Sequence, residues 1–436
     1  MRQYAWSQLS ASEQSALLER PALREDATVQ SRVADIISRV RRDGDGALFE
    51  LTEQIDGVRP ETLKATADDF IAAEATLNPE QKRAIAAAQA NIRRFHEAQL
   101  TAPIAVETAP GVLCERLSRP IARVGLYVPA GSAPLPSTAL MLAIPAEIAG
   151  CTTRVLCSPP QADGGINPAV LYVAQLCGVE DVYKVGGAQA IAAIAYGTDS
   201  VPKVDKIFGP GNTWVTAAKE QVAQDPSGAA KDMPAGPSEV LVIADDSADP
   251  AFVAADLLSQ AEHGADSQSA LISTSATLTD AVLEAIASQR VSLSRRDIVA
   301  KSLANSFALV VDDLETALAI SNRYAPEHLI LQLRNARTWI DRVQAAGSVF
   351  LGPWTPESVG DYCSGTNHVL PTYGFARSYS SLGVNDFLRS MTIQEISASG
   401  LQAIGPTACT LADMEGLDAH ARAVSLRLEK ARGDAP

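Results

Sequence analysis

Apolar residues from about residue 124 onward follow a repeating pattern of short runs and helical stripes. Each run is followed by a turn and then by residues with helical spacing. Because parallel strands require crossover connections, this alternation predicts parallel sheets covered by helices. The first series of expected strands is Val124–Val128, Arg154–Cys157, Val182–Val185 and Lys206–Phe208, and the second is Val240–Ile243, Ala270–Ser273, Phe307–Val311, Leu329–Leu331 and Ser348–Leu351.

The two series predict an α/β fold with two Rossmann-like parallel-sheet domains and small helical extensions at both ends. Residues 1–25 are expected to form the N-terminal helical extension, because Ser10–Glu13 matches a capping box and Pro21 ends the helix. A helical stripe from Val29 to Val40 is closed by Gly44. The expected first domain is 26–125 with 237–380, the second is 126–236, and a mostly helical tail covers 381–436.

Composition narrows the class of protein. The chain has 436 residues, 47% of them hydrophobic and 20% charged, and a formal net charge of -15. Such a chain lacks the basic character of a nucleic-acid binder. We expect no membrane span, because the best apolar stretch, Ser137–Cys151, is too short. The first ten residues hold no signal-like run, and the six cysteines form no CxxC pair, so we expect a cytoplasmic protein.

Three glycine loops follow predicted strands at the carboxyl edge, where open α/β sheets bind ligands. They are Tyr127–Gly131, Val185–Gln189 and Gly209–Asn212. None matches the GxGxxG fingerprint of dinucleotide-binding folds. Two interpretations stay open: ordinary turns that require glycine, or a non-standard nucleotide cleft in which helix N-termini face a pyrophosphate.

A possible metal half-site lies at the end of a helix expected over about 250–263, which Asp249 caps. Gln260 and His263 are three residues apart and therefore share one face of its last turn. Four of the five histidines follow residue 260, each near acid or amide side chains, and they are His263, His328, His368 and His420. This pattern favours a divalent metal, with zinc as first choice, although separate structural histidines remain an alternative.

Two further segments carry candidate chemistry. Glu327 and His328 are adjacent, which in a regular strand would point them to opposite faces, but Pro326 favours a bend that brings both to one substrate. A carboxylate and an imidazole together suit a reaction that moves more than one proton. A solvated charge pair at a strand start is the alternative. The segment Gly360–His368 is a loop rich in polar groups, as functional loops often are.

These motifs together resemble the histidinol dehydrogenase family. The resemblance runs in the family's order from about residue 30 to 425. Ala130 and Cys363 stand where the family more often has glycine and alanine, neither at a site residue. The segments that carry it are Val124–Pro129, Val185–Ala190, Phe208–Asn212, Ala235–Val240, Gln260–His263, Tyr324–His328, Gly360–His368 and Glu415–His420.

The resemblance implies a zinc-dependent oxidation of L-histidinol to L-histidine, through L-histidinaldehyde and with two NAD, as the last step of histidine biosynthesis. It implies Glu327 and His328 as the catalytic pair, and one zinc per subunit. It places metal and catalytic residues mainly in the first domain and the NAD loops in the second. The implied zinc ligands are Gln260, His263, Asp361 and His420; the substrate contacts are these four with Ser238, His328, His368 and Glu415; and the NAD contacts are Tyr127, Gln189 and Asn212.

The resemblance also implies a homodimer in which the C-terminal tail reaches the neighbouring subunit, so that Glu415 and His420 complete the partner's site. Two other functional classes remain open on the residues alone. One is a zinc hydrolase in which Glu327 activates water, and the other is a non-catalytic metal- or nucleotide-binding protein.

Overall fold

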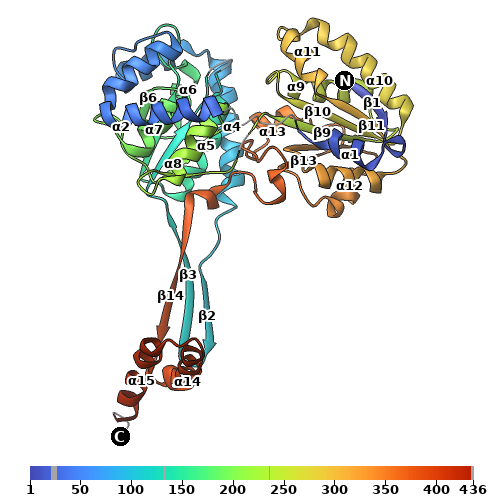
Figure 1. Ribbon diagram of the computed structural model, residues 1–436. Helices are drawn as coiled ribbons and strands as arrows, with labels where there is room; N and C mark the ends of the chain where they lie inside the picture. Colours follow the sequence, from blue (N-terminus) through green and yellow to red (C-terminus); the bar gives the residue numbers. More distant parts are fainter. Residues whose placement is uncertain (21–26, 131–133, 235, 434–436) are drawn as a thin grey trace. The chain divides into compact units, whose positions relative to one another are not determined.

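The computed structural model describes residues 1–20, 27–130, 134–234 and 236–433, and it divides into two compact units (Figure 1). The first unit comprises residues 1–99 and 121–387, and the second comprises 100–120 and 388–436. Pro21, Gly131 and Ala235, which were named above, lie outside the described residues. Within the described ranges, no helix has the length and apolar character needed to cross a bilayer.

The first unit has a six-stranded parallel sheet with strand order β1-β11-β10-β9-β12-β13. From β9, the chain adds β10 and β11 on one side of this strand and then β12 and β13 on the other. The strands are β1 (Arg2–Ala5), β9 (Glu239–Ala244), β10 (Gln268–Ser273), β11 (Phe307–Val310), β12 (His328–Gln332) and β13 (Ser348–Leu351), and the helices are α1 (Ala11–Leu18), α9 (Pro250–Ala261), α10 (Ala276–Gln289), α11 (Arg296–Ala304), α12 (Leu314–Tyr324) and α13 (Glu357–Tyr362).

Alternation along the strands separates two cores on the two faces of this sheet. On β9, Val240 and Val242 pack with helices α9, α10 and α11, whereas Leu241 and Ile243 pack with α1 and α12 (Figure 1). Successive strand residues point to opposite faces, so a sheet covered on both sides needs a continuous apolar run. This explains why β9 is buried at every position.

The first unit also has a five-stranded parallel sheet with order β6-β5-β4-β7-β8 and its own helices. Helices α2, α7 and α8 share one apolar cluster on it. The strands are β4 (Arg123–Tyr127), β5 (Thr153–Ser158), β6 (Asp181–Lys184), β7 (Lys206–Phe208) and β8 (Ala230–Lys231), and the helices are α2 (Ala27–Asp56), α3 (Ala67–Thr76), α4 (Pro79–Glu97), α5 (Pro136–Ala149), α6 (Pro168–Leu176), α7 (Gly187–Tyr196) and α8 (Thr213–Gln224).

The predicted domain division is wrong for the helices before residue 100. Residues 26–125 were assigned to the domain of the second strand series, yet α2 packs on α7 and α8, α3 on α6, and α4 on α5. The apolar stripe of α2 shows that it is covered, but a stripe does not reveal by which sheet. Gly44 also differs from expectation: its φ of 54° kinks α2, and the helix continues to Asp56.

The N-terminal extension is only partly helical. The capping box predicted at Ser10–Glu13 is present, with both reciprocal hydrogen bonds, at the start of α1. Before it, β1 joins the six-stranded sheet as an edge strand beside β11. Short 3-10 helices complete the first unit: η1 (Trp6–Gln8), η2 (Arg290–Ser292), η3 (Ala336–Arg342), η4 (Phe375–Arg377) and η5 (Val384–Phe387).

The second unit has an antiparallel sheet of order β14-β3-β2, followed by two helices. Its elements are β2 (Ile104–Ala109), β3 (Val112–Pro120), β14 (Leu388–Ile396), α14 (Ala398–Met414) and α15 (Asp418–Gly433). The predicted tail is therefore helical after residue 397 but begins with a strand. These strands were missed because they are largely exposed and show no buried apolar face.

Candidate active site

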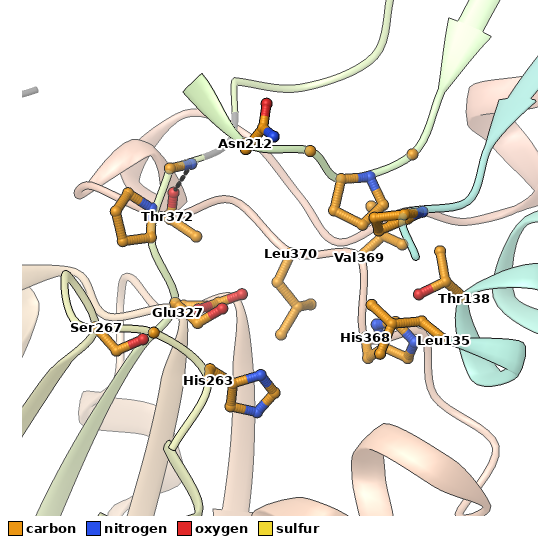
Figure 2. A pocket seen from close by; sticks show the side chains of 18 of the residues that line it. Leu135, Thr138, Asn212, His263, Ser267, Glu327, His368, Val369, Leu370 and Thr372 are labelled. Atoms are coloured by element: carbon orange, nitrogen blue, oxygen red, sulfur yellow. Dashed lines mark hydrogen bonds between the residues drawn. The ribbon is translucent and has the colours of Figure 1, made fainter. Parts of the chain in front are cut away.

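A cavity of about 370 Å³ in the first unit collects several of the predicted site residues. Figure 2 shows Glu327 and His263 near one another beside it, with His368 on a different wall. Ser238 and Asp361 also line the cavity, as does the loop Gly209–Asn212. Residues from five separate chain segments therefore face one space.

Glu327 and His328 converge as the bend at Pro326 suggested. Strand β12 begins only at His328, so Glu327 lies outside the regular strand, and its Oε2 is 3.6 Å from His328 Nδ1. Both side chains are held by the backbone of Glu239. The Glu239 N–H donates to Glu327 Oε2 at 2.8 Å, and His328 Nδ1 lies 3.1 Å from the Glu239 carbonyl oxygen.

This contact decides which imidazole nitrogen is available for chemistry. Because a carbonyl only accepts, His328 donates its Nδ1–H to the Glu239 carbonyl, which leaves Nε2 for a contact with another molecule. His328 Nε2 is buried, has no hydrogen-bond partner within the described chain, and lies 3.6 Å from Asp361 Oδ1. The geometry thus leaves Nε2 as the imidazole nitrogen without a hydrogen-bond partner among the residues that the structure describes.

The pair is buried among acids, and this shifts both pKa values. Burial raises the pKa of the Glu327 carboxyl to about 8, against the opposing effects of His328 and the Glu239 N–H. Burial alone would lower the pKa of His328, but the carboxylates of Glu357, Glu327 and Asp361 outweigh it and raise this pKa well above its ordinary value. Displaced titrations of this kind are typical of catalytic groups.

The residues beside this pair fit a divalent metal. Ligand atoms of His263, Glu357 and Asp361 lie within 4.8 Å of one another. Gln260 is fully buried on α9, and among the described residues neither its Oε1 nor its Nε2 has a hydrogen-bond partner. A buried amide without partners is costly unless a ligand satisfies it. Nitrogen and oxygen donors of this kind suit zinc.

Glu357 is the site residue that sequence reasoning missed. It is 1% exposed, its Oε1 lies 3.6 Å from His328 Nδ1, and its Oε2 has no hydrogen-bond partner in the described ranges. Burial raises its pKa to about 8, opposed by the charge of His328. The short helix α13 that carries it begins at Glu357 and places Asp361 one turn later. That i, i+4 acid spacing was the available signal.

The expected NAD residues line a second, larger cavity of about 850 Å³ beside the five-stranded sheet. Tyr127 Oη accepts a hydrogen bond from Gly187 N at 3.1 Å, and Asn212 caps α8 by accepting from the N–H groups of Trp214 and Val215. Gln189 donates to Asp56 Oδ2 at 3.5 Å. The N-termini of α7 and α8 meet this cavity, an arrangement suited to a pyrophosphate.

The remaining predicted residues are His368 in the first unit and Glu415 and His420 in the second. His368 lines the first cavity, and its buried Nε2 has no partner among the described residues. Glu415 and His420 belong to the second unit, where Glu415 is the C-cap of α14 and His420 lies in α15, both exposed. Within the first unit, therefore, three of the four expected metal ligands are present.

Comparison with known proteins gives the family. A model of the family described as histidinol dehydrogenase matches residues 18–428. This chain belongs to the histidinol dehydrogenase family. A histidinol dehydrogenase of Vibrio vulnificus (strain CMCP6) is 57% identical over 435 residues, covering 99% of this chain and 100% of the relative. One of Xanthomonas euvesicatoria pv. vesicatoria (strain 85-10) is 58% identical over 423 residues, covering 97% and 98%.

A crystal structure points the same way. Histidinol dehydrogenase from Elizabethkingia anophelis superposes with a TM-score of 0.95 at 46% identity, covering 99% of each chain. The likeness includes the α/β architecture and extends over both units. As a histidinol dehydrogenase family member, the chain is an NAD-dependent oxidoreductase. The predicted family and fold class are confirmed.

Proposed function

We propose that this chain oxidises L-histidinol to L-histidine through L-histidinaldehyde, with two NAD and one zinc per subunit. The observation that carries the proposal is the convergence of Glu327 and His328 beside His263 and Asp361. Oxidation of an alcohol to an acid consumes one water and releases a proton at each stage, and a carboxylate next to an imidazole can serve both needs.

His328 and Glu327 divide the proton transfers. His328 Nε2 removes the hydroxyl proton of the alcohol as its carbon loses a hydride. Glu327 then takes a proton from the water that adds to the aldehyde carbonyl, and His328 removes a hydroxyl proton from the resulting hydrate as the second hydride leaves. The hydrogen bonds from and to Glu239 hold both groups in place throughout.

Gln260, His263 and Asp361 would hold the metal, with His420 as fourth ligand, and Ser238, His368 and Glu415 would contact the substrate. Bound zinc would supply positive charge beside Asp361, which favours neutral nitrogen donors and the neutral form of His328. Tyr127, Gln189 and Asn212 would hold NAD, which accepts the hydride. The unpartnered amide of Gln260 supports the metal assignment.

Under this proposal the protein is a homodimer, because the tail of each subunit would supply Glu415 and His420 to the site of its partner. We also propose a cytoplasmic location. The six cysteines are all free, which suits a reducing compartment.

The test is an assay of the zinc-loaded full chain with L-histidinol and NAD, following NADH absorbance in the near ultraviolet. We expect two NADH for each L-histidine formed, and loss of activity after chelation that zinc restores. No NADH from folded, zinc-loaded protein would contradict the proposal. A control without NAD separates the zinc hydrolase, which would still turn over an amide substrate.

A further inference from the structure

Arg20, which follows α1 in the N-terminal segment, is buried against the catalytic sheet. Its side chain is 9% exposed and forms a bidentate pair with Glu239, with Nε 2.7 Å from Oε2 and Nη2 2.8 Å from Oε1. The guanidinium also stacks on Tyr324, with Cζ 3.7 Å from the ring centroid. Because the planar guanidinium both pairs with two carboxylate oxygens and stacks on a ring, it fixes the orientation of these groups as well as their distance.

The partner of Arg20 is the residue whose backbone holds both catalytic groups. Glu239 begins β9, its N–H donates to Glu327 Oε2, and its carbonyl accepts from His328 Nδ1. Any shift of the Glu239 peptide therefore moves the two hydrogen bonds that orient the catalytic pair. The carboxylate of Glu239 is itself 2% exposed, and besides Arg20 it accepts a hydrogen bond from Tyr324 Oη at 3.2 Å.

Arg20 also contacts the segment just before the Glu327–His328 pair. Its Nη2 donates to the Ala325 carbonyl at 3.3 Å, and Ala325 lies two residues before Glu327. Ala325 has a φ of 53°, a conformation that alanine adopts only when its surroundings impose it. One guanidinium thus spans the start of β9 and the turn into β12, which are the two segments that define the Glu327–His328 geometry.

We infer that Arg20 is a positioning residue for Glu327 and His328, acting through Glu239 and Ala325. The inference rests on the proposed function, in which those two side chains move the protons. It assigns the N-terminal segment a part in catalysis, because β1 and α1 anchor Arg20 to the sheet. Arg20 touches neither expected metal ligands nor the cavity beside Glu327.

The central test is Arg20→Met in the zinc-loaded full chain. We expect kcat to fall about 10-fold to 100-fold, since small misplacements of catalytic groups have effects of this size. KM for L-histidinol and the zinc content should change little, because no metal or substrate contact is removed. Arg20→Lys keeps the charge but cannot bridge two carboxylate oxygens and a carbonyl, so its kcat should be intermediate.

A matched control removes another arginine contact of the N-terminal segment, the one between α12 and α1. Arg323 donates to Ser15 Oγ at 2.7 Å from an exposed position, so Arg323→Met should leave kcat unchanged. If Arg20→Met fails to fold, the double variant Arg20→Met with Glu239→Gln removes the unpaired buried charge. It should fold and still have low kcat, because Ala325 has lost its donor. Wild-type kcat in Arg20→Lys or in the double variant would overturn the inference.

Hydrogen exchange separates failure of this inference from failure of the proposed function. Amides around Ala325–Leu329 should exchange faster in Arg20→Lys than in Arg323→Met, whatever reaction the enzyme performs. If wild-type protein does not oxidise L-histidinol but the exchange differs as stated, the proposed function is wrong and the anchoring role of Arg20 stands. Equal exchange in both variants would overturn the anchoring role.

Discussion

The two parallel sheets present opposite edges to the cavities. On the five-stranded sheet, Tyr127 ends β4, and the loops with Gly187 and Asn212 follow β6 and β7, so this sheet uses its carboxyl edge. On the six-stranded sheet, Ser238 immediately precedes β9 and Glu327 immediately precedes β12, so this sheet uses its amino edge. Open α/β sheets ordinarily bind ligands at the carboxyl edge.

The choice of edge decides which end of each helix faces the ligand. At a carboxyl edge helices begin, so α7 and α8 direct N–H groups and positive dipole ends at the larger cavity, which suits the pyrophosphate of the proposed NAD site. At an amino edge helices end, and α9 ends at Ala261 between Gln260 and His263. The negative end of its dipole then favours a cation. The same architecture, used from its two ends, therefore suits the proposed NAD site at one edge and the proposed metal site at the other.

The largest expected effect is on the amino-edge chemistry. Glu327→Gln keeps the shape of the side chain but removes the base that activates water, so kcat for L-histidine formation should fall about 10²-fold to 10⁴-fold. NAD affinity should be unchanged, because the carboxyl-edge cavity is untouched. Steady-state assays and NAD titrations measure both. Glu315→Gln, an exposed change at the start of α12, is the control. A normal kcat in Glu327→Gln would remove the catalytic role of this residue.

A second prediction concerns the carboxyl-edge loop. Lys219 and Asp232 form a buried ion pair that holds both backbone groups of Gly209: Lys219 Nζ donates to the Gly209 carbonyl at 2.9 Å, and Gly209 N donates to Asp232 Oδ2 at 2.8 Å. Lys219→Met leaves Asp232 buried and unpaired, so the free energy of unfolding should fall by about 3 kcal/mol or more. KM for NAD should rise more than KM for L-histidinol.

Urea unfolding and steady-state kinetics test this second prediction. Lys231→Met provides the control, since Lys231 pairs with Glu220 at 3.3 Å in a partly exposed position of the same sheet region. Surface pairs of this kind contribute little, so its stability should barely change. If Lys219→Met raised KM for L-histidinol and left that for NAD unchanged, the division of labour between the two sheets would be wrong.

Much of the fold could be predicted because buried parallel strands leave a strong pattern. All nine strands expected from the apolar runs exist, and β7 and β13 have the predicted bounds. The helix expected over about 250–263 exists as α9, with Asp249 as its N-cap. What failed was the assignment of α2, α3 and α4 to a sheet. Helix α2 has a clear apolar stripe, but only the tertiary structure shows which sheet covers it.

The site was harder to predict, and for a different reason. Gln260 ends α9 with Ala261, and the N–H of His263 donates to the Gln260 carbonyl at 3.2 Å just beyond the helix, so their proximity follows from local geometry. Glu357 lies near groups that are far from it in sequence. Its pKa is raised only because folding buries it and removes water from the carboxyl group. Arg20 is more extreme: nothing in the sequence around it indicates that its partner is Glu239, 219 residues later.

A buried acid on α9 also reduces stability at neutral pH. Asp256 on α9 is 6% exposed, burial raises its pKa to about 6, and Gln332 donates to it at 3.3 Å. Since the folded state binds this proton more tightly than the unfolded state, its contribution is favourable below about pH 4 and is lost as pH rises through about 6. Asp256→Asn should therefore be more stable by about 2 kcal/mol at pH 8.

Urea unfolding of metal-free protein at two pH values measures this effect. At pH 4 the protonated acid and the amide are alike, so wild type and Asp256→Asn should unfold at similar denaturant concentrations. A difference that stays constant between pH 4 and pH 8 would show that Asp256 does not titrate in this range. Asp246→Asn, an exposed change in the same region, should show no difference at either pH.

The smallest expected effect is on the carboxyl edge. Tyr127→Phe removes the hydroxyl that accepts the Gly187 N–H, at the glycine with a φ of 61° that begins α7. An N–H left without its acceptor should weaken NAD binding by about 1 kcal/mol, which is about a fivefold rise in KM for NAD. Tyr196→Phe removes the same atom elsewhere on this sheet, where the hydroxyl donates to Asp225 at 3.0 Å, and should leave KM for NAD unchanged. Equal shifts in both variants would mean that hydroxyl loss acts through stability alone, and a shift in KM for L-histidinol would mean that Tyr127 serves the amino-edge site instead.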